Sequence, residues 1–281
     1  MREHVELVSV HGGHSGEFSN HASNTLEEII QAYCTRGFSW VGIAEHMPPV
    51  SDDYVFPEDS AVGFDAATVY ERFSRYIASC RQLQEQYASS LQIYVGFETE
   101  VYTGSEDFIR RLVREFRPDY IVGSVHHVND IPIDMSPEMY AQAIEVAGGI
   151  EQLYCDYFDQ QYDLIDGLRP AVVGHFDLVR IFDGDYRERI EESEIQRRIR
   201  RNLERIEELG AILDFNVRAW EKGADEPYVS RSILLQAREL GIAAVPGDDS
   251  HGVEGVGLHI EEGIEILQDL GFDTNWRAPV G

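Results

Sequence analysis

Seven short apolar runs, each followed by a longer helical pattern, predict an α/β fold built on a parallel sheet. The expected strands are residues 5–10, 40–45, 91–101, 120–128, 171–175, 211–217 and 243–247. The expected helices are 25–37, 70–88, 106–116, a long stretch near 137–166, 188–209, 229–241 and 262–271. Asn24 is expected to cap the first helix and Gly37 to end it. No strand has the polar pattern of a sheet edge, which favours a closed barrel; an open doubly wound sheet is the alternative.

The 281 residues contain no internal repeat, low-complexity tract or linker, so we expect one domain over residues 1–281. One connection differs from the others. Residues 46–66 form a long segment rich in proline, aspartate and aromatic residues, and it begins at a strand-end histidine. Connections of this length inside a domain are usually functional. We therefore expect a lid over the site.

The charge balance is strongly acidic, with 51 Asp and Glu against 23 Lys and Arg and a net charge of −28. Such a surface repels a phosphate backbone, so nucleic acid is not expected as a partner. No apolar run approaches the roughly 18 residues of a membrane span. The first residues lack a signal-peptide pattern, and Cys34, Cys80 and Cys155 lie far apart. These features predict a cytoplasmic protein without a disulfide framework or a thiolate zinc site, and they carry no signal for the oligomeric state.

Eight of the ten histidines lie at or just after the C-terminal ends of expected strands: His11, His14, His21, His46, His126, His127, His175 and His251. In a parallel barrel these ends converge on one face, where active sites are built. Carboxylates share the same positions: Glu45, Glu98, Glu100, Asp177 and Asp249. Imidazole and carboxylate together suit zinc, manganese or iron better than calcium or magnesium. The pattern therefore predicts a site for two or more metal ions with a bridging carboxylate.

The alternation of side chains along a strand refines this prediction. Consecutive residues point to opposite faces, so only one of His126 and His127 is expected to face the site. Glu98 and Glu100 are expected on the same face, and either could be the bridging carboxylate. The chain has no GxSxG, GxxxxGK[ST] or strand-associated GxGxxG motif, which disfavours a serine hydrolase and a nucleotide-binding loop.

Six segments together resemble one known family: SVHGGHSGEFSNHASNTLEE (9–28), AEHMPP (44–49), GFETEV (96–101), GSVHHV (123–128), GHFDLV (174–179) and GDDSHG (247–252). In this combination the chain resembles the PHP (polymerase and histidinol phosphatase) family, in its monofunctional histidinol-phosphatase branch, over nearly its whole length. The resemblance implies a distorted (β/α)7 TIM-like barrel, a single PHP-type metal-dependent phosphoesterase domain, and three divalent metal ions, usually zinc, manganese or iron.

The resemblance also implies which residues hold the ions. The first ion would be bound by His11, His14, Glu98 and Asp249, the second by His21, His46 and His251, and the third by Glu98, His126 and His175. The family has one residue between the first two histidines, whereas Gly12 and Gly13 both intervene here. Two glycines can bulge a strand end and re-aim an imidazole. We expect both histidines to remain ligands, with displacement of His11 from the metal as the alternative.

The expected reaction is hydrolysis of a phosphate monoester by metal-activated hydroxide. The resemblance implies that the substrate is L-histidinol phosphate, an intermediate of histidine biosynthesis. Glu98, Asp249 and His251 would act through the ions, and Asp177 or His127 would protonate the leaving alkoxide. Arg218 and Arg180 would clamp the phosphate. An ammonium group would be favoured by acidic residues near the site: Glu45, Glu100 and the lid residues Asp52, Asp53 and Glu58.

Three other functions compete with this reading. A PHP phosphoesterase could act on another small phosphoester or a nucleotide. A non-catalytic module could use its metal ions only for stability. An amidohydrolase would require a strand lysine as bridging ligand, but the only lysine, Lys222, lies beyond the strand and Glu98 takes the bridging position.

Overall fold

A sheet of seven parallel strands organises the computed structural model, which describes residues 5–280. The strands are β1 (Leu7–Ser9), β2 (Phe38–His46), β3 (Gln92–Glu98), β4 (Val122–Gly123), β7 (Val172–Val173), β8 (Ile212–Asn216) and β9 (Ala243–Gly247). They pair in chain order, each parallel to the next. Each expected strand is therefore present, although several are shorter than the apolar run that predicts them.

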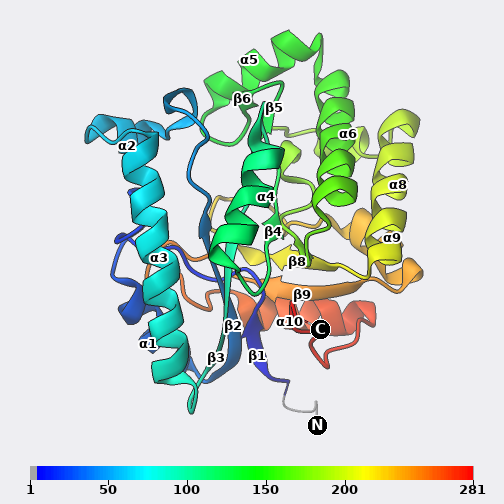
Figure 1. Cartoon of the computed structure of the whole chain (residues 1–281). Coiled ribbons are helices and arrows are strands. Elements are labelled where there is room, and N and C mark those ends of the chain that lie inside the picture. Colours follow the sequence, from blue (N-terminus) through cyan, green and yellow to red (C-terminus); the bar gives the residue numbers. More distant parts are fainter. Residues whose placement is uncertain (1–4, 281) are drawn as a thin grey trace.

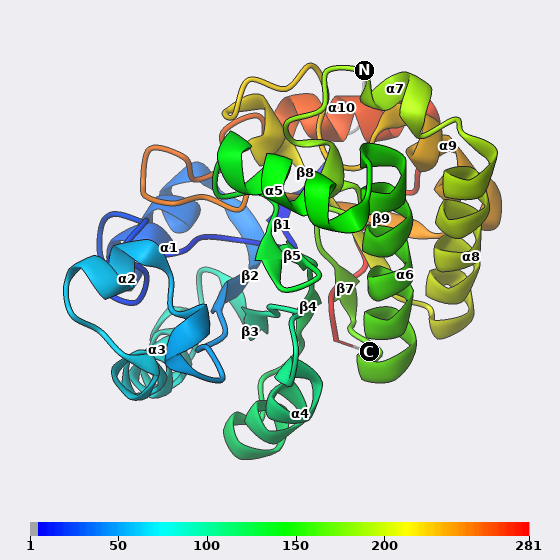
Figure 2. The same cartoon turned by 90° about the horizontal axis from the view of Figure 1, so that it is seen from above.

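The first and last strands lie beside each other, which nearly closes the sheet into a barrel. Val10 N donates to Pro246 O at 2.9 Å, and Asp249 N donates to His11 O at 2.8 Å. Helices surround the strands (Figures 1 and 2). A doubly wound sheet would instead reverse its strand order at one point. The fold is thus the expected distorted (β/α)7 barrel in a single domain, and the open-sheet alternative does not apply.

The outer helices differ from the expected ones mainly at their ends. They are α1 (Leu26–Arg36), α2 (Pro57–Ala61), α3 (Ala66–Tyr87), α4 (Ser105–Phe116), α5 (Pro137–Ala147), α6 (Ile150–Leu168), α7 (Tyr186–Arg189), α8 (Ser193–Leu209), α9 (Arg231–Leu240) and α10 (Ile260–Leu270). The expected helix near 137–166 is two helices, because Gly148 and Gly149 both adopt positive φ between them. Residues 5–280 contain no helix that is long and apolar enough to span a membrane.

The cap of α1 is Thr25, so the prediction of Asn24 was wrong by one residue. The Thr25 side chain accepts from Glu28 N, and the Glu28 carboxylate accepts from Thr25 N, which together form a capping box. At the other end, Gly37 has φ +79° and ends the helix as predicted.

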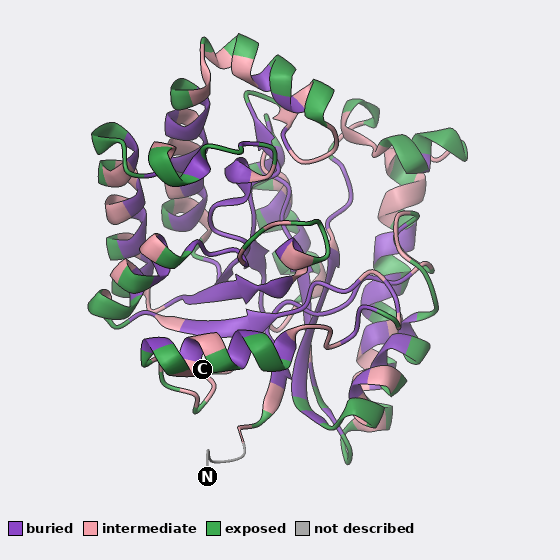
Figure 3. Cartoon of the chain, turned by 180° about the vertical axis from the view of Figure 1, so that it is seen from behind, coloured by how far each residue is buried: buried purple, intermediate pink, exposed green. Residues whose placement is uncertain are grey.

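Buried apolar side chains fill the interior of the barrel toward the N-terminal ends of its strands (Figure 3). Polar side chains gather at the C-terminal ends of the strands. Tyr120 crosses the interior, and its Oη donates to Val10 O at 3.0 Å. A Cβ atom at Gly42 or Gly96 would overlap the Tyr120 ring, so these strand positions require glycine. The indole of Trp276 closes the N-terminal end by donating to Glu6 O at 2.8 Å. With this end packed and closed, the opposite end is left for the site.

Candidate metal centre

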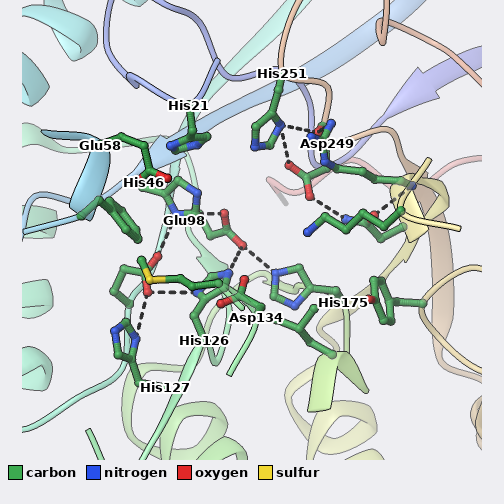
Figure 4. Close-up of a pocket in the computed structure, with 18 residues that line it drawn as sticks. His21, His46, Glu58, Glu98, His126, His127, Asp134, His175, Asp249 and His251 are labelled. Atoms are coloured by element: carbon green, nitrogen blue, oxygen red, sulfur yellow. Dashed lines mark hydrogen bonds and ion pairs between the residues drawn. The ribbon is translucent and has the colours of Figure 1, made fainter. Parts of the chain in front are cut away.

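Most of the strand-end histidines and carboxylates line one cavity of about 280 Å³ at the C-terminal end of the barrel (Figure 4), whereas His11 and His14 are fully buried and do not line it. Its lining residues are His21, His46, Phe56, Glu58, Glu98, Glu100, His126, His127, Asp134, Met135, His175, Leu178, Asn216, Arg218, Lys222, Tyr228, Asp249 and His251. They come from strands and connections throughout the chain. The expected convergence of the strand ends is therefore present.

Glu98, the last residue of β3, occupies the centre of this arrangement and is 1% exposed. Its Oε1 lies 2.9 Å from His175 Nε2 and 3.3 Å from His126 Nε2. Its Oε2 lies 3.4 Å from both His11 Nε2 and His46 Nδ1. One oxygen of Glu98 therefore faces His126 and His175, and the other faces His11 and His46. A carboxylate placed between two groups of imidazoles in this way has the geometry of a bridging ligand.

Asp249 is a second focus of histidines. Its Oδ1 lies 3.1 Å from His14 Nε2 and 4.0 Å from His11 Nε2. The His14 ring in turn lies 4.6 Å from the ring of His251 and 5.9 Å from that of His21, measured between ring centroids. The histidines around Asp249 and those around Glu98 therefore form one continuous cluster.

Four overlapping sets of these residues could hold metal ions. They are His14, His21 and His46; His11, His14 and Asp249; His46, Glu100 and His126; and Glu98, His126 and His175. Within the described chain, the buried nitrogens His11 Nε2, His14 Nε2 and His21 Nε2 have no hydrogen-bond partner. Buried polar atoms are rarely left unsatisfied in proteins. His11 Nε2 and His14 Nε2 both face Asp249 Oδ1, at 4.0 and 3.1 Å, and such unpartnered nitrogens beside a carboxylate are suited to bind divalent metal ions.

The carboxylates at the centre are strongly biased toward their charged form. Burial alone would raise the pKa of Glu98, but His11 and His126 hold that pKa well below its usual range. The same opposition operates at Asp249, where burial is outweighed by His11 and His14 and the pKa is again held well below its usual range. Both carboxylates are therefore negative at neutral pH and available to bind cations.

Glu45 positions His14 and does not line the cavity, although substrate binding was expected of it. Its carboxylate accepts from Ser15 N at 2.7 Å, Ser15 Oγ at 2.8 Å and Ser19 Oγ at 2.6 Å, and lies 3.4 Å from His14 Nδ1. Burial would lower the pKa of His14, but the contacts with Asp249 and Glu45 raise that pKa to about 9. Glu45 thus fixes the loop and the orientation of the imidazole.

The two glycines after His11 pack closely against the barrel. Gly12 N donates to Gly42 O at 2.7 Å, and a Cβ atom at Gly13 would lie only 2.8 Å from Ile29 Cγ2. The extra residue is therefore absorbed by backbone that has no room for side chains. His11 keeps its Nε2 toward the centre, so the structure does not displace it from the cluster.

Asp214, in the middle of β8, was missed by the sequence analysis. Its Oδ2 lies 2.9 Å from His11 Nδ1 and accepts from Asn216 Nδ2 at 3.1 Å. A carboxylate on one imidazole nitrogen directs the other nitrogen at the metal. The available signal was an acidic residue inside the strand-like run AILDF (211–215), where the structure buries it completely.

Glu100 lines the cavity and contacts three histidines. Its Oε1 lies 2.8 Å from His46 Nδ1, and its Oε2 lies 3.1 Å from His126 Nδ1 and 3.4 Å from His127 Nδ1. Glu98 and Glu100 share a face, as expected. However, both His126 and His127 line the cavity, so the prediction that only one would do so was wrong. The reason is that β4 ends at Gly123 and His127 begins a separate strand, β5, so the alternation of one continuous strand does not relate His126 to His127.

Asp177 and Arg180, which were expected to protonate the leaving group and to bind the phosphate, do not line the cavity. The Asp177 Oδ2 accepts from Arg180 Nε at 3.1 Å and from the backbone and hydroxyl of Ser230. The Arg180 guanidinium lies 4.5 Å from the centre of the Tyr228 ring and is nearly fully buried. This pair therefore supports the wall of the cavity. Arg218 does line the cavity and donates to Asp249 O at 3.0 Å.

The segment expected to be a lid contributes Phe56 and Glu58 to the cavity, whereas Asp52 and Asp53 do not line it. The single lysine, Lys222, does line it. Asp134 and Met135, which follow the small hairpin of β5 (His127–Val128) and β6 (Ile131–Pro132), were not anticipated at all.

The profile of the PHP domain matches residues 12–218. A candidate histidinol-phosphatase of Schizosaccharomyces pombe is 36% identical, over 95% of this chain and 88% of the relative. A candidate histidinol phosphatase from Listeria monocytogenes has a similar structure, with a TM-score of 0.80 and 26% identity, covering 91% of this chain and 99% of that one. Histidinol phosphate phosphatase from Lactococcus lactis, solved with zinc, L-histidinol and phosphate, has a TM-score of 0.71 and 20% identity, covering 95% of each chain.

Proposed function

The chain belongs to the PHP domain family, and we propose that it is a metal-dependent phosphatase that hydrolyses L-histidinol phosphate to L-histidinol and phosphate. The observation that carries this proposal is the cluster of histidines around Glu98 and Asp249 at the open end of the barrel. The reaction class is phosphoric monoester hydrolysis. The relative from Schizosaccharomyces pombe, similar over nearly its full length, supports the choice of substrate.

The proposed ligands fall into three groups. His11, His14, Glu98 and Asp249 would hold one divalent ion, His21, His46 and His251 would hold a second, and Glu98 with His126 and His175 would hold a third. The zinc in the Lactococcus lactis structure supports zinc among the candidates zinc, manganese and iron. When bound, such ions offset phosphoryl charge and lower the pKa of water, so that hydroxide is available at neutral pH.

Two cationic side chains of the cavity are placed to bind and orient the phosphate ester. Arg218 and Lys222 line the cavity and form no ion pair with a carboxylate among the residues described, so both are available to the phosphate. The water oxygen forms a new bond to phosphorus as the bond from phosphorus to the alcohol oxygen breaks. Arg218 is held beside Asp249 by its hydrogen bond to the backbone, which fixes the phosphate end of the cavity on that side.

The leaving alcohol oxygen must receive a proton. Asp177 is held by Arg180 and Ser230 away from the cavity, which weakens its candidacy. His127 lines the cavity and lies 3.4 Å from Glu100, so it is the proposed donor. A histidine within reach of the leaving oxygen can act as the general acid of such a reaction.

The reaction is expected to take place in the cytoplasm. The cysteines Cys34, Cys80 and Cys155 are all unpaired, which suits a reducing compartment.

The decisive test is phosphate release by metal-reconstituted protein from L-histidinol phosphate, p-nitrophenyl phosphate and a nucleoside monophosphate. The matched variant Glu98→Gln keeps the shape of the side chain and removes the bridging charge. Selective turnover of L-histidinol phosphate that depends on Glu98 is the expected result. Turnover of the other esters alone would contradict the substrate assignment, and metal binding without any turnover would favour a non-catalytic module.

A further inference from the structure

We propose that Asp134 and Glu58 form a subsite for the ammonium group of the substrate, so that the cavity selects phosphate monoesters with a cationic tail. This inference rests on the proposed function and concerns the end of the substrate that does not react. Figure 4 shows both side chains at the cavity, with Glu58 near His46 and Asp134 near His126.

Asp134 is placed over the cavity by the hairpin that precedes it. After β5 and β6, Ile133 N donates to His126 O at 2.9 Å, and the Ile133 side chain is fully buried. Three residues later Ser136 caps α5 by accepting from Met139 N at 3.2 Å. Asp134 therefore lies on a short segment that is fixed on both sides, one of them at a residue of the histidine cluster.

The carboxylate of Asp134 is close to other cavity groups but bonded to none of them. Burial raises the pKa of the cavity residue Tyr228, and the negative charge of Asp134 adds to this effect. Among the residues described, Asp134 forms neither a hydrogen bond nor an ion pair. A charged group held at a cavity without a partner is available to a ligand of opposite charge.

Glu58 is the one lid acid in the same condition. Asp52 lies outside the cavity and accepts from Ala66 N at 2.9 Å, and Asp59 accepts from Asn20 Nδ2 at 2.7 Å. Glu58 lines the cavity, and no hydrogen bond or ion pair to it occurs among the described residues. The acids that remain uncommitted at the cavity, Glu58 and Asp134, therefore come from two separate segments.

The other acids of the cavity cannot serve this purpose. Glu98, Glu100 and Asp249 each lie within 3.5 Å of histidine nitrogens, and bound metal ions would neutralise much of their charge. Asp134 and Glu58 are consequently the cavity carboxylates whose negative charge remains available to a ligand.

The opposite charge is found elsewhere in the same cavity. Arg218 and Lys222 enter from the connection after β8, and Arg218 is fixed on the side of Asp249 by its hydrogen bond to Asp249 O. A cavity with cations on one side and unpaired anions on another suits a ligand that carries both charges. L-histidinol phosphate has a phosphate and an ammonium on neighbouring carbon atoms, whereas an uncharged tail would leave the acids unpaired.

The experiment compares kcat/KM for L-histidinol phosphate with kcat/KM for its deaminated analogue, 3-(imidazol-4-yl)propyl phosphate. The native protein is expected to prefer the amine. Asp134→Asn should lower kcat/KM for L-histidinol phosphate by about 10- to 100-fold and change that for the analogue by less than about twofold. Glu58→Gln should act in the same direction with a smaller effect, because its side chain is more exposed.

Two control variants remove equal charge outside the cavity. Glu138→Gln changes an exposed residue in the first turn of α5, and Asp53→Asn changes an exposed lid residue. Both should leave the preference for the amine unchanged. Metal content measured by elemental analysis should be the same in all variants.

Equal loss on both esters in Asp134→Asn, or native protein that does not distinguish them, would overturn the subsite. Native protein that hydrolyses p-nitrophenyl phosphate but not L-histidinol phosphate would overturn the proposed substrate instead. In that event, the same variants compared on phosphoethanolamine and ethyl phosphate decide the subsite independently.

Discussion

Asp214→Asn tests the idea that a buried carboxylate aims His11 at the metal centre. Asparagine has the same shape and can still accept from His11 Nδ1, where Asp214 Oδ2 now lies at 2.9 Å. The amide nitrogen would take the place of Asp214 Oδ1, which has no hydrogen-bond partner among the described atoms. The variant is therefore expected to fold and to lose chiefly the negative charge.

The size of the effect follows from the hydrogen bond that changes. A bond to a charged group contributes about 1.5–3 kcal/mol and a neutral one about 0.5–1.5 kcal/mol. The difference of about 1–1.5 kcal/mol corresponds to roughly tenfold weaker metal binding. This value lies at the lower end of the 10- to 100-fold losses typical of groups that orient metal ligands. Asp214→Ala removes the bond entirely and should cost roughly 100-fold.

Metal affinity is measured by competition with a chromophoric chelator at fixed pH, together with thermal unfolding of the metal-free protein. Asp119→Asn is the control, because its carboxylate accepts from Arg81 at 2.7 Å and from Val95 N at 2.8 Å, away from the metal cluster. It should lower stability and leave metal affinity unchanged. If Asp214→Asn is stably folded and binds metal within about twofold of the native protein, Asp214 does not orient His11 as argued.

Three further predictions use other parts of the site. Glu98→Gln should lower phosphate release by roughly a thousandfold and reduce the number of ions retained on gel filtration, because Glu98 contacts His11 and His46 through one oxygen and His126 and His175 through the other. Unchanged metal content would refute the bridging role. In the metal-free protein His14 is protonated below its pKa of about 9, so metal binding must displace a proton, and affinity should fall as pH is lowered from 9 by about tenfold per unit for each proton released. Calorimetry in buffers of different ionisation enthalpy measures this release, and a pH-independent affinity would exclude it. Gly13→Ala should destabilise the fold by about 1–3 kcal/mol in urea unfolding, because the new Cβ meets Ile29 and Ser250, whereas Gly184→Ala, with open space around it, should not.

Much of the fold and the location of the site could be predicted from the sequence. Parallel βα units bring every strand's C-terminal end to one face, whatever the details of packing. For this reason Glu98 and His175, 77 residues apart in sequence, could be expected together, and their side chains lie 2.9 Å apart. The two glycines after His11 put the position of His11 among the ligands in doubt, and their close packing leaves His11 in the cluster.

Periodicity was less informative where the strands were short. His126 and His127 were assigned to opposite faces because a continuous strand was expected, but β4 ends at Gly123 and His127 begins the separate strand β5. Asp214 was overlooked because it lies inside a strand and not at its end, and its role depends on a contact with the distant His11.

The residue types and their order along the chain thus suffice to predict the barrel, the metal-binding end and most of the histidine cluster, because these follow from local pattern and from the geometry common to parallel barrels. The partner of each charged side chain depended on packing between distant segments. Glu45 and Asp177 were expected at the site, yet they are satisfied by serines and Arg180 outside the cavity, whereas Asp134 lines the cavity and was not expected there. A buried charge must find a partner, and only the tertiary structure decides which charges find one within the protein and which remain for a ligand.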